Sequence, residues 1–178
     1  MRNQSTSFLD DLSFDRSHYY IKKSSIVGKI NFNNRIFYPK FQKIDEPLTN
    51  LVLSQHLNRE YTIASPLIKN NKTNYLFMEY KGVKSREFYY LTKHLLNSFN
   101  IQEYTFYHGK NINTILLFIS VDSISLDDAT IELNRLSNAL STRLTKEWKC
   151  LPDVSLPLEY NIFTLPYKEF NLSSFDIY

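Results

Sequence analysis

The segment Thr114–Val121 constrains the fold more than any other part of the sequence. It reads as a strand with apolar side chains on both of its alternating faces. Those side chains are Ile115, Leu117 and Ile119 on one face, and Leu116 and Phe118 on the other. A sheet that contains such a strand must be covered on both sides. The sequence therefore predicts a layered domain in which this strand is central.

Strand and helix patterns surround this segment in a regular order. One helix is expected after Ser85, which can cap it, with apolar residues at three- and four-residue spacing from Phe88 to Phe99. A second is expected to start at Ser125-Leu126-Asp127-Asp128, with acids in its first turn. Trp148 and Cys150 fall at the expected end of the second helix. The other expected strands are Tyr75–Tyr80, Gln102–His108 and Tyr160–Leu165. The resulting order, β-α-β-β-α-β, is that of the ferredoxin-like arrangement.

The N-terminal part has a different pattern. Asn33 and Asn34 tolerate the positive φ of a two-residue turn, so residues 29–38 predict a β-hairpin. A helix is expected at Leu48–Leu57 with Pro47 in its first turn. Tyr61–Ile68 is expected to form a strand that Pro66 restricts to an edge or a short run. The predicted class is α+β, in which a basic N-terminal β-β-α-β unit packs with a ferredoxin-like half.

The length of 178 residues fits one domain. We expect an N-terminal arm over residues 1–15, a basic lobe over 16–70, a ferredoxin-like lobe over 71–170 and a tail over 171–178. The arm should form either a short helical turn or a frayed end. Two helices should cover one face of the central sheet, and the basic lobe should pack on or beside the other.

Composition excludes several classes of protein. Cys150 is the only cysteine, so an intrachain disulfide and a Cys-rich zinc site are both excluded. The first ten residues lack the apolar core of a signal peptide. The longest aliphatic or aromatic run, Ile115–Ile119, is far shorter than the ~18 residues of a membrane helix. We expect a cytoplasmic protein without a membrane partner.

The net charge of +3 is unevenly distributed. Residues 16–43 contain seven basic residues and no acidic residue, and aromatic residues lie among them. This combination is typical of phosphate contact and base stacking on a single strand. The alternatives are an acidic protein surface as partner, or a hairpin whose charged face is only solvated. The candidate contacts for nucleic acid or another polyanion are Lys22, Lys23, Lys29, Arg35, Lys40 and Lys43.

Signatures of catalysis are weak. The loop His108-Gly109-Lys110 lacks the spacing of a phosphate-binding loop, and a plain β-turn is favoured. Among the acids that could hold a hard cation, Asp127 and Asp128 suit the first turn of a helix better. His94 lies beside the apolar stripe of the first helix, where a partly buried structural role is favoured. No nucleophile, metal site or cofactor is predicted.

Aromatic residues on the central strands raise a further alternative. A ferredoxin-like sheet can stack RNA bases on such residues, and Tyr75–Tyr80 has a faint likeness to the first element of these modules. The strand Thr114–Val121 lacks the second element. Core packing is therefore favoured for these aromatic residues.

Several short stretches resemble an uncharacterised family of small epsilonproteobacterial proteins, a domain of unknown function. The most specific stretch is Tyr160–Tyr167, and the likeness extends over roughly residues 16–170. Other matching stretches are His18–Lys23, Ile44–Thr49, Leu136–Ser141 and Glu147-Trp148. The resemblance implies membership of this family, and it implies no biochemical activity because the function of the family is unknown.

The element order is also similar to the catalytic core of archaeo-eukaryotic-type primases. This likeness implies paired acids after the first strand, which would hold two metal ions, and a histidine-containing segment on a later strand. Here the first position offers Glu79 alone, and residues 110–115 contain no histidine. If the likeness holds, this chain is a degenerate member.

The favoured interpretation is a non-enzymatic binding module that contacts nucleic acid or an acidic protein surface through its basic hairpin. One alternative is a degenerate primase-like nucleotide-binding protein, with a site formed by Glu79, His108, Lys110 and Asp122. Another is a structural protein that forms a homo-oligomer.

Overall fold

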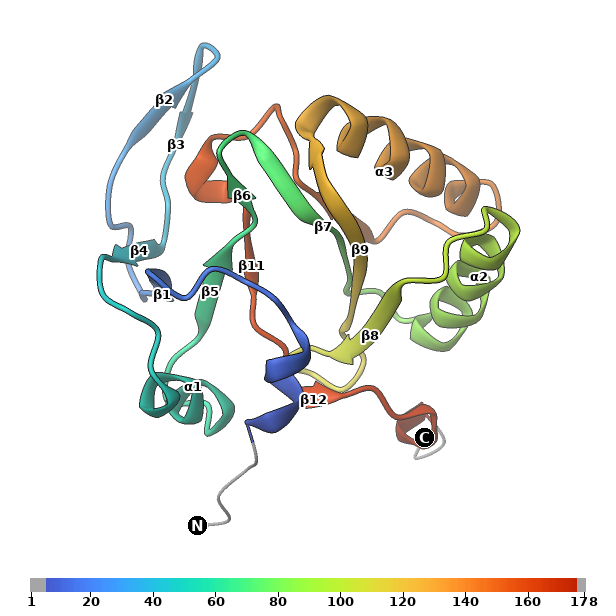
Figure 1. Cartoon of the computed structure of the whole chain (residues 1–178), viewed down its shortest axis with the longest axis horizontal. Helices are drawn as coiled ribbons and strands as arrows, with labels where there is room; N and C mark the ends of the chain where they lie inside the picture. The colour runs from blue at the N-terminus through green and yellow to red at the C-terminus, as the bar shows by residue number, and fades with distance from the viewer. Residues whose placement is uncertain (1–5, 176–178) are drawn as a thin grey trace.

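The computed structural model describes residues 6–175, and its larger sheet has the strand order β10-β7-β9-β8-β12, with β6 paired to β7 (Figure 1). Neighbouring strands in this sheet are all antiparallel. The strands are β6 (Ile68–Lys69), β7 (Lys72–Tyr80), β8 (Tyr104–His108), β9 (Ile115–Ser125), β10 (Trp148–Leu151) and β12 (Lys168–Glu169).

Helices α2 (Ser85–Ser98) and α3 (Leu126–Ser141) lie together on one face of this sheet (Figure 1). Together with strands β7, β8, β9 and β10 they form the predicted β-α-β-β-α-β order, and the α+β class is confirmed. The Ser125 side chain accepts a hydrogen bond from the backbone N–H of Asp128, so it caps α3 as expected. Ser85 does not cap α2, because it is the first residue of the helix and Lys84 occupies the N-cap position; its hydroxyl donates to the carbonyl of Asn113.

The fourth strand of the ferredoxin-like unit was assigned wrongly from the sequence. It is β10, formed by Trp148–Leu151, and not the segment Tyr160–Leu165. Trp148 lies opposite Tyr80 on β7, and its indole N–H donates to the hydroxyl of Ser137 on α3 at 2.9 Å. The residues expected at a helix end are therefore a strand, because α3 stops at Ser141 and the chain returns along β7.

The second sheet has the order β11-β5-β1-β4 and draws strands from both ends of the chain. The strand formed by the predicted final segment, β11 (Ile162–Thr164), pairs with β5 of the N-terminal part. The others are β1 (Tyr19–Lys22), β4 (Phe41–Ile44) and β5 (Ile63–Pro66). Strand β5 lies inside this sheet, and Pro66 is its last residue.

The hairpin expected at residues 29–38 is present and projects from the body of the molecule (Figure 1). Its strands β2 (Ile30–Phe32) and β3 (Arg35–Phe37) pair only with each other within the described chain. Asn33 and Asn34 have φ of 47° and 59°, as the two-residue turn requires. We call residues 26–38 the arm; it is distinct from the N-terminal arm of residues 1–15.

The remaining elements are short. Helix α1 (Asn50–Leu57) begins later than expected, because the Thr49 side chain caps it and leaves Pro47 outside. The helical turn η1 (Ser7–Asp11) confirms the first expectation for the N-terminal arm, and its Leu9 is fully buried. Turns η2 (Leu158–Tyr160) and η3 (Leu172–Phe175) are the remaining elements of residues 6–175. No helix within residues 6–175 is long and apolar enough to cross a membrane.

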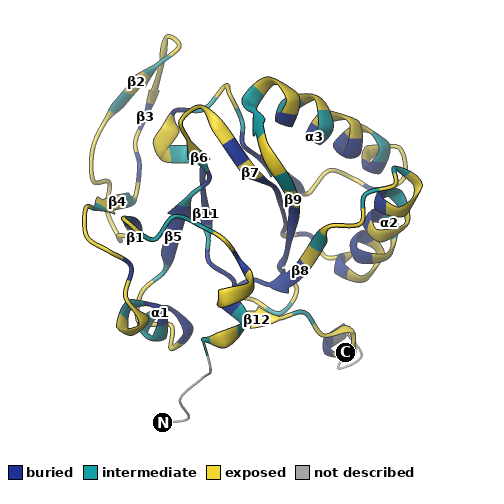
Figure 2. Cartoon of the chain, in the orientation of Figure 1, coloured by how far each residue is buried: buried dark blue, intermediate teal, exposed yellow. Residues whose placement is uncertain are grey.

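Two hydrophobic cores lie on opposite faces of the larger sheet (Figure 2). Ile115, Leu117 and Ile119 pack under the helices α2 and α3. Leu116 and Phe118 pack against the second sheet, η1 and α1. The two-sided coverage that the strand pattern predicts is confirmed, and the central strands therefore leave no open aromatic face for stacking RNA bases.

Candidate functional site

A cavity of about 700 Å³ lies where the core between the two sheets ends, and basic side chains dominate its walls. We call it the basic cleft. Its cationic residues are Lys22, Lys23, Arg59, Lys81, Lys110 and Lys149, and its carboxylates are Glu60 and Glu79. Cations that converge on a concave surface create a positive potential that attracts anions.

The cations of the basic cleft come from separate elements of the fold. Lys22 ends β1, Lys149 lies on β10, and Lys81 follows the last residue of β7. Arg59 follows α1, and Lys110 lies in the loop between β8 and β9. The site therefore exists only when the two sheets are packed together.

Glu79 is the one cleft carboxylate that is buried. Its side chain is 9% exposed and lies 3.4 Å from Lys81 Nζ and 3.6 Å from Lys149 Nζ. It occupies the same face of β7 as Tyr75 and Phe77, at the point where the apolar core gives way to the cleft. A buried carboxylate requires such partners, so two of the six cations are engaged in neutralising it.

Arg59 is held in a conformation that is uncommon for arginine. Its φ is 65°, and it occupies the position after the cap of α1 where glycine is usual. The backbone N–H of Arg59 donates to the carbonyl of His56, and that of Glu60 donates to Gln55, as in a Schellman motif. Its guanidinium donates to the carbonyl oxygen of Lys110 at 2.8 Å and lies 5.5 Å from the centre of the Tyr167 ring.

His56 supports this wall from behind. It is fully buried, its Nδ1 accepts from the backbone N–H of Ile63, and its Nε2–H therefore donates to the carbonyl of Leu165. The ring packs against Tyr167 with centroids 4.0 Å apart. Burial lowers the pKa of His56 to about 4, so the neutral imidazole is the stable form.

His108 has a structural role in the fold. Its Nε2 accepts from the backbone N–H of Asn171 at 3.2 Å, so its Nδ1–H donates to the carbonyl of Ile112 at 2.9 Å. Burial lowers its pKa. Both ring nitrogens are therefore occupied in holding the β8–β9 loop against the C-terminal segment.

The four residues of the alternative nucleotide site do not form one group. Glu79 and Lys110 line the same cleft, and His108 lies behind its wall. Asp122 is exposed on the distal part of β9, six residues beyond Leu116, which is opposite Glu79. At about 3.3 Å per residue, this places it roughly 20 Å away.

The candidate basic residues of the N-terminal segment also lie in different places, some in the basic cleft and the others outside it. Lys22 and Lys23 line the basic cleft. Lys29 and Arg35 lie on the arm, where the Arg35 guanidinium is 4.8 Å from the Phe37 ring. Lys40 is exposed before β4, and Lys43 pairs with Asp45 at 2.9 Å.

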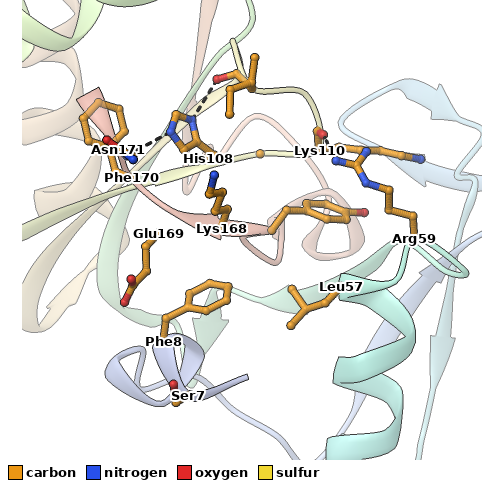
Figure 3. A pocket seen from close by; sticks show the side chains of 13 residues that line it. Ser7, Phe8, Leu57, Arg59, His108, Lys110, Lys168, Glu169, Phe170 and Asn171 are labelled. Carbon is orange, nitrogen blue, oxygen red and sulfur yellow. Dashed lines mark hydrogen bonds between the residues drawn. The ribbon is translucent and has the colours of Figure 1, made fainter. Parts of the chain in front are cut away.

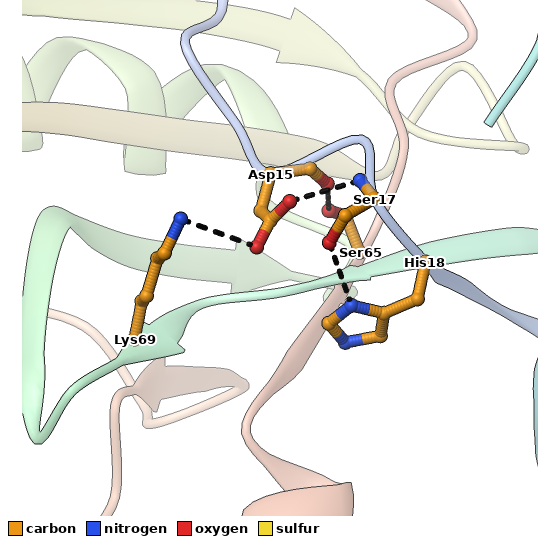
Figure 4. Close-up of polar contacts among 5 residues, drawn as sticks. All are labelled: Asp15, Ser17, His18, Ser65 and Lys69. Carbon is orange, nitrogen blue, oxygen red and sulfur yellow. Dashed lines mark hydrogen bonds and ion pairs between the residues drawn. The ribbon is translucent and has the colours of Figure 1, made fainter. Parts of the chain in front are cut away.

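A set of Asp15, Ser17 and His18 resembles a catalytic triad in composition only (Figure 4). The Ser17 hydroxyl lies 3.2 Å from His18 Nδ1, but Asp15 accepts from the backbone N–H of Ser17 and pairs with Lys69 at 3.7 Å. These contacts lower the pKa of Asp15. The carboxylate does not orient the imidazole, as a triad requires.

Other reactive groups lie apart from the cleft. Across residues 6–175, no three His, Cys, Asp or Glu side chains come together in a group that could hold a metal ion. Cys150 is partly buried on β10, and burial raises the pKa of its thiol to about 11. His94, expected to be partly buried, is exposed on α2.

Sequence reasoning missed Arg59, Lys81 and Lys149. The spacing of Glu79 and Lys81 by two residues is a usable signal, because it places both on one side of an extended chain. No comparable signal marks Lys149, since its place depends on the pairing of β10 with β7.

Residues 7–74 match a family described as a domain of unknown function (DUF1882). The matched range includes η1, the strands from β1 to β6, α1 and the beginning of β7. No curated protein matches the chain. The match agrees with the expected likeness to an uncharacterised family, over a shorter range. The bacterial source and the primase likeness stay predictions.

Proposed function

We propose that this chain is a binding module for single-stranded nucleic acid, whose backbone phosphates are held in the basic cleft. The observation that carries the proposal is the convergence of six cationic side chains on one cavity that contains two carboxylates. A flexible single strand can follow such a groove, and its phosphates can replace the counter-ions of the lysines.

The distribution of ion pairs supports this choice. Lys22, Lys23 and Lys110 form no ion pair with another residue in the described part of the chain, whereas Lys81 and Lys149 pair with Glu79. The unpaired lysines can neutralise phosphates without leaving a buried carboxylate behind. Phe41 and Tyr61 also line the cleft and offer rings to unstacked bases.

The test is fluorescence anisotropy with short single-stranded RNA and DNA at several salt concentrations. We expect the logarithm of the affinity to fall linearly with the logarithm of salt, with a slope of about 0.7 per neutralised phosphate. The triple variant Lys22→Glu/Lys23→Glu/Lys110→Glu should lose binding. Absence of binding by the wild-type protein even at low salt refutes the proposal.

A control with the same change of charge is available outside the cleft. In Lys29→Glu/Arg35→Glu/Lys43→Glu, three exposed cations are reversed, and none of them lines the cleft. We expect this variant to keep most of its affinity. Equal losses in the two triple variants would show that only net charge matters, and would remove the cleft from the proposal.

An acidic protein surface is a second candidate partner, and the arm favours it. Ile36 and Tyr38 are 51% and 52% exposed there, beside Lys29 and Arg35, and Ile26 and Val27 are exposed at its base. Arms of two copies would repel each other by charge, so a homo-oligomer formed through the arm is disfavoured. Light scattering of the wild-type protein tests the oligomeric state.

A further inference from the structure

A second cavity, of about 600 Å³, shares a wall with the basic cleft. Figure 3 shows the side chains that line it. We call it the side pocket. It is formed by η1, the end of α1, the β8–β9 loop and the segment that contains β12. Its volume is in the range of small-molecule sites. The residues that line both cavities are Arg59, Gly109, Lys110 and Tyr167.

The side pocket has an apolar side and a cationic side. Phe8 and Leu57 give the apolar lining, and Lys168 lies across the cavity from Phe8 (Figure 3). Arg59 follows Leu57 at the end of α1, and its guanidinium extends to the Lys110 loop. Lys168 lies directly opposite His108 in the sheet, on the short edge strand β12. A ligand that fits both sides must combine a flat or apolar part with an anionic group.

Phe8 is the lining ring best placed to receive the flat part. Phe170 is already stacked on Tyr89 at 4.5 Å and on His108 at 5.1 Å. Tyr167 packs against His56 and the Arg59 guanidinium. Phe8 is half-buried and reaches Tyr107 in a tilted contact at 6.1 Å, so part of its ring faces the cavity.

We infer that the side pocket binds a nucleotide. The base lies against Phe8 and Leu57, and the phosphate lies at Lys168 and Arg59. Stacking on an aromatic ring and charge-assisted hydrogen bonds are the two interactions that this chemistry needs. Glu169, at the rim, adds an acceptor for an amino group of the base.

A free mononucleotide and the terminal nucleotide of a strand present the same chemistry to the pocket. The shared wall of Arg59 and Lys110 would let a strand that lies in the basic cleft place its end in the side pocket. Binding of a strand end in the pocket rests on the proposed function, whereas binding of a free mononucleotide does not.

The first arm of the test is calorimetric titration with adenosine 5′-monophosphate, adenosine and ribose 5-phosphate at low salt. We expect the mononucleotide to bind about tenfold more tightly than either fragment, because only it reaches both sides of the pocket. Lys168→Glu should reduce the affinity for the mononucleotide and for ribose phosphate, and leave that for adenosine nearly unchanged.

The base side is tested by Phe8→Leu, which removes the ring and keeps an apolar side chain in the core. We expect about a tenfold loss of affinity for the mononucleotide. Thermal unfolding monitored by circular dichroism shows whether the variant is folded. Lys29→Glu on the arm is the matched control for Lys168→Glu, and its affinity for the mononucleotide should equal that of the wild type.

The second arm compares an intact oligonucleotide with one whose terminal nucleotide is abasic. Weaker binding of the abasic strand, with the difference abolished by Phe8→Leu, assigns the pocket to a strand end. Equal binding of both strands, together with no binding of the mononucleotide, overturns the inference and leaves the proposed function standing. Binding of the mononucleotide without binding of any strand keeps the pocket and removes the proposed function.

Discussion

The guanidinium of Arg59 donates a hydrogen bond of 2.8 Å to the carbonyl oxygen of Lys110, and thereby joins the end of α1 to the loop between β8 and β9. The two residues are 51 positions apart in the chain, and both cavities meet at this contact. It connects a segment of the N-terminal part to the ferredoxin-like unit, so the wall between the cavities depends on the packing of the two.

The positive φ of Arg59 predicts an unusual order of stability among variants. Arg59→Ala and Arg59→Gly both remove the hydrogen bond to Lys110, but only alanine keeps a Cβ in the left-handed conformation. We expect Arg59→Gly to be more stable than Arg59→Ala by about 1 kcal/mol. Urea unfolding of both variants measures this difference. An alanine variant as stable as the glycine variant would contradict the left-handed geometry.

His56 predicts that the protein loses stability in mild acid. Its pKa is lowered from an ordinary value of 6.5 to about 4, so the unfolded chain binds a proton more readily than the folded chain between these values. The free energy of unfolding should therefore fall as the pH drops through this range, by about 2 kcal/mol between pH 7 and pH 5. His108, whose pKa is also lowered, contributes in the same direction.

Two measurements check the role of His56. Urea unfolding of the wild type near pH 7 and pH 5 gives the total change. In His56→Gln, which does not titrate in this range, the difference between the two pH values should be smaller even if the variant is less stable throughout. A titration of the imidazole by NMR that finds an ordinary pKa at His56 would disprove the assignment.

Removal of the Glu79 charge should increase the affinity of the basic cleft for anions. In Glu79→Gln, Lys81 and Lys149 no longer neutralise a carboxylate, so both contribute to the potential of the basic cleft. We expect about threefold tighter binding of single-stranded nucleic acid at low salt. The variant removes the Coulomb repulsion between the Glu79 carboxylate and a bound phosphate, taken at about 6 Å and at the dielectric constant of water. Anisotropy titrations measure the affinity.

The same variant separates the binding module from the primase-like alternative. A carboxylate that held a divalent cation for the ligand would make Glu79→Gln bind more weakly, and the binding of the wild type would require that cation. Titrations with magnesium and with a chelator therefore give opposite results for the two hypotheses.

Removal of the Ser137 hydroxyl should lower the stability of the protein, and this loss tests the position of β10. The indole N–H of Trp148 donates to the Ser137 hydroxyl at 2.9 Å, and both residues are buried. Ser137→Ala leaves the N–H without a partner, which should cost about 1–3 kcal/mol. Because Trp148 is the only tryptophan, its fluorescence follows both its environment and unfolding. Ser141→Ala, at an exposed position at the end of α3, is the control.

Local patterns in the sequence account for most of the secondary structure without reference to tertiary contacts. The two-sided strand β9, the Asn33-Asn34 turn and the Ser125 cap depend on residues within a few positions of each other. For these elements, apolar periodicity, backbone preference and capping chemistry all agree, and the structure confirms them.

Strand pairing between distant segments was decided by the tertiary structure alone. Trp148–Leu151 is too short for its pattern to distinguish a strand from a helix end, and it becomes a strand because β7 offers it a hydrogen-bonding edge. Residues 162–164 do read as a strand, but their sequence cannot show that they pair with β5 instead of β7. The choice depends on which edge is open once the cores have formed.

The candidate site also depends partly on local sequence and partly on tertiary packing. Residues 16–43 are basic by composition alone, and two of their lysines reach the basic cleft. The other four cations of the cleft are scattered between residues 59 and 149. They meet only because the two sheets pack face to face and bring the ends of β1, β7 and α1 together. Charge composition is a property of the chain, whereas the convergence of charges is a property of its packing.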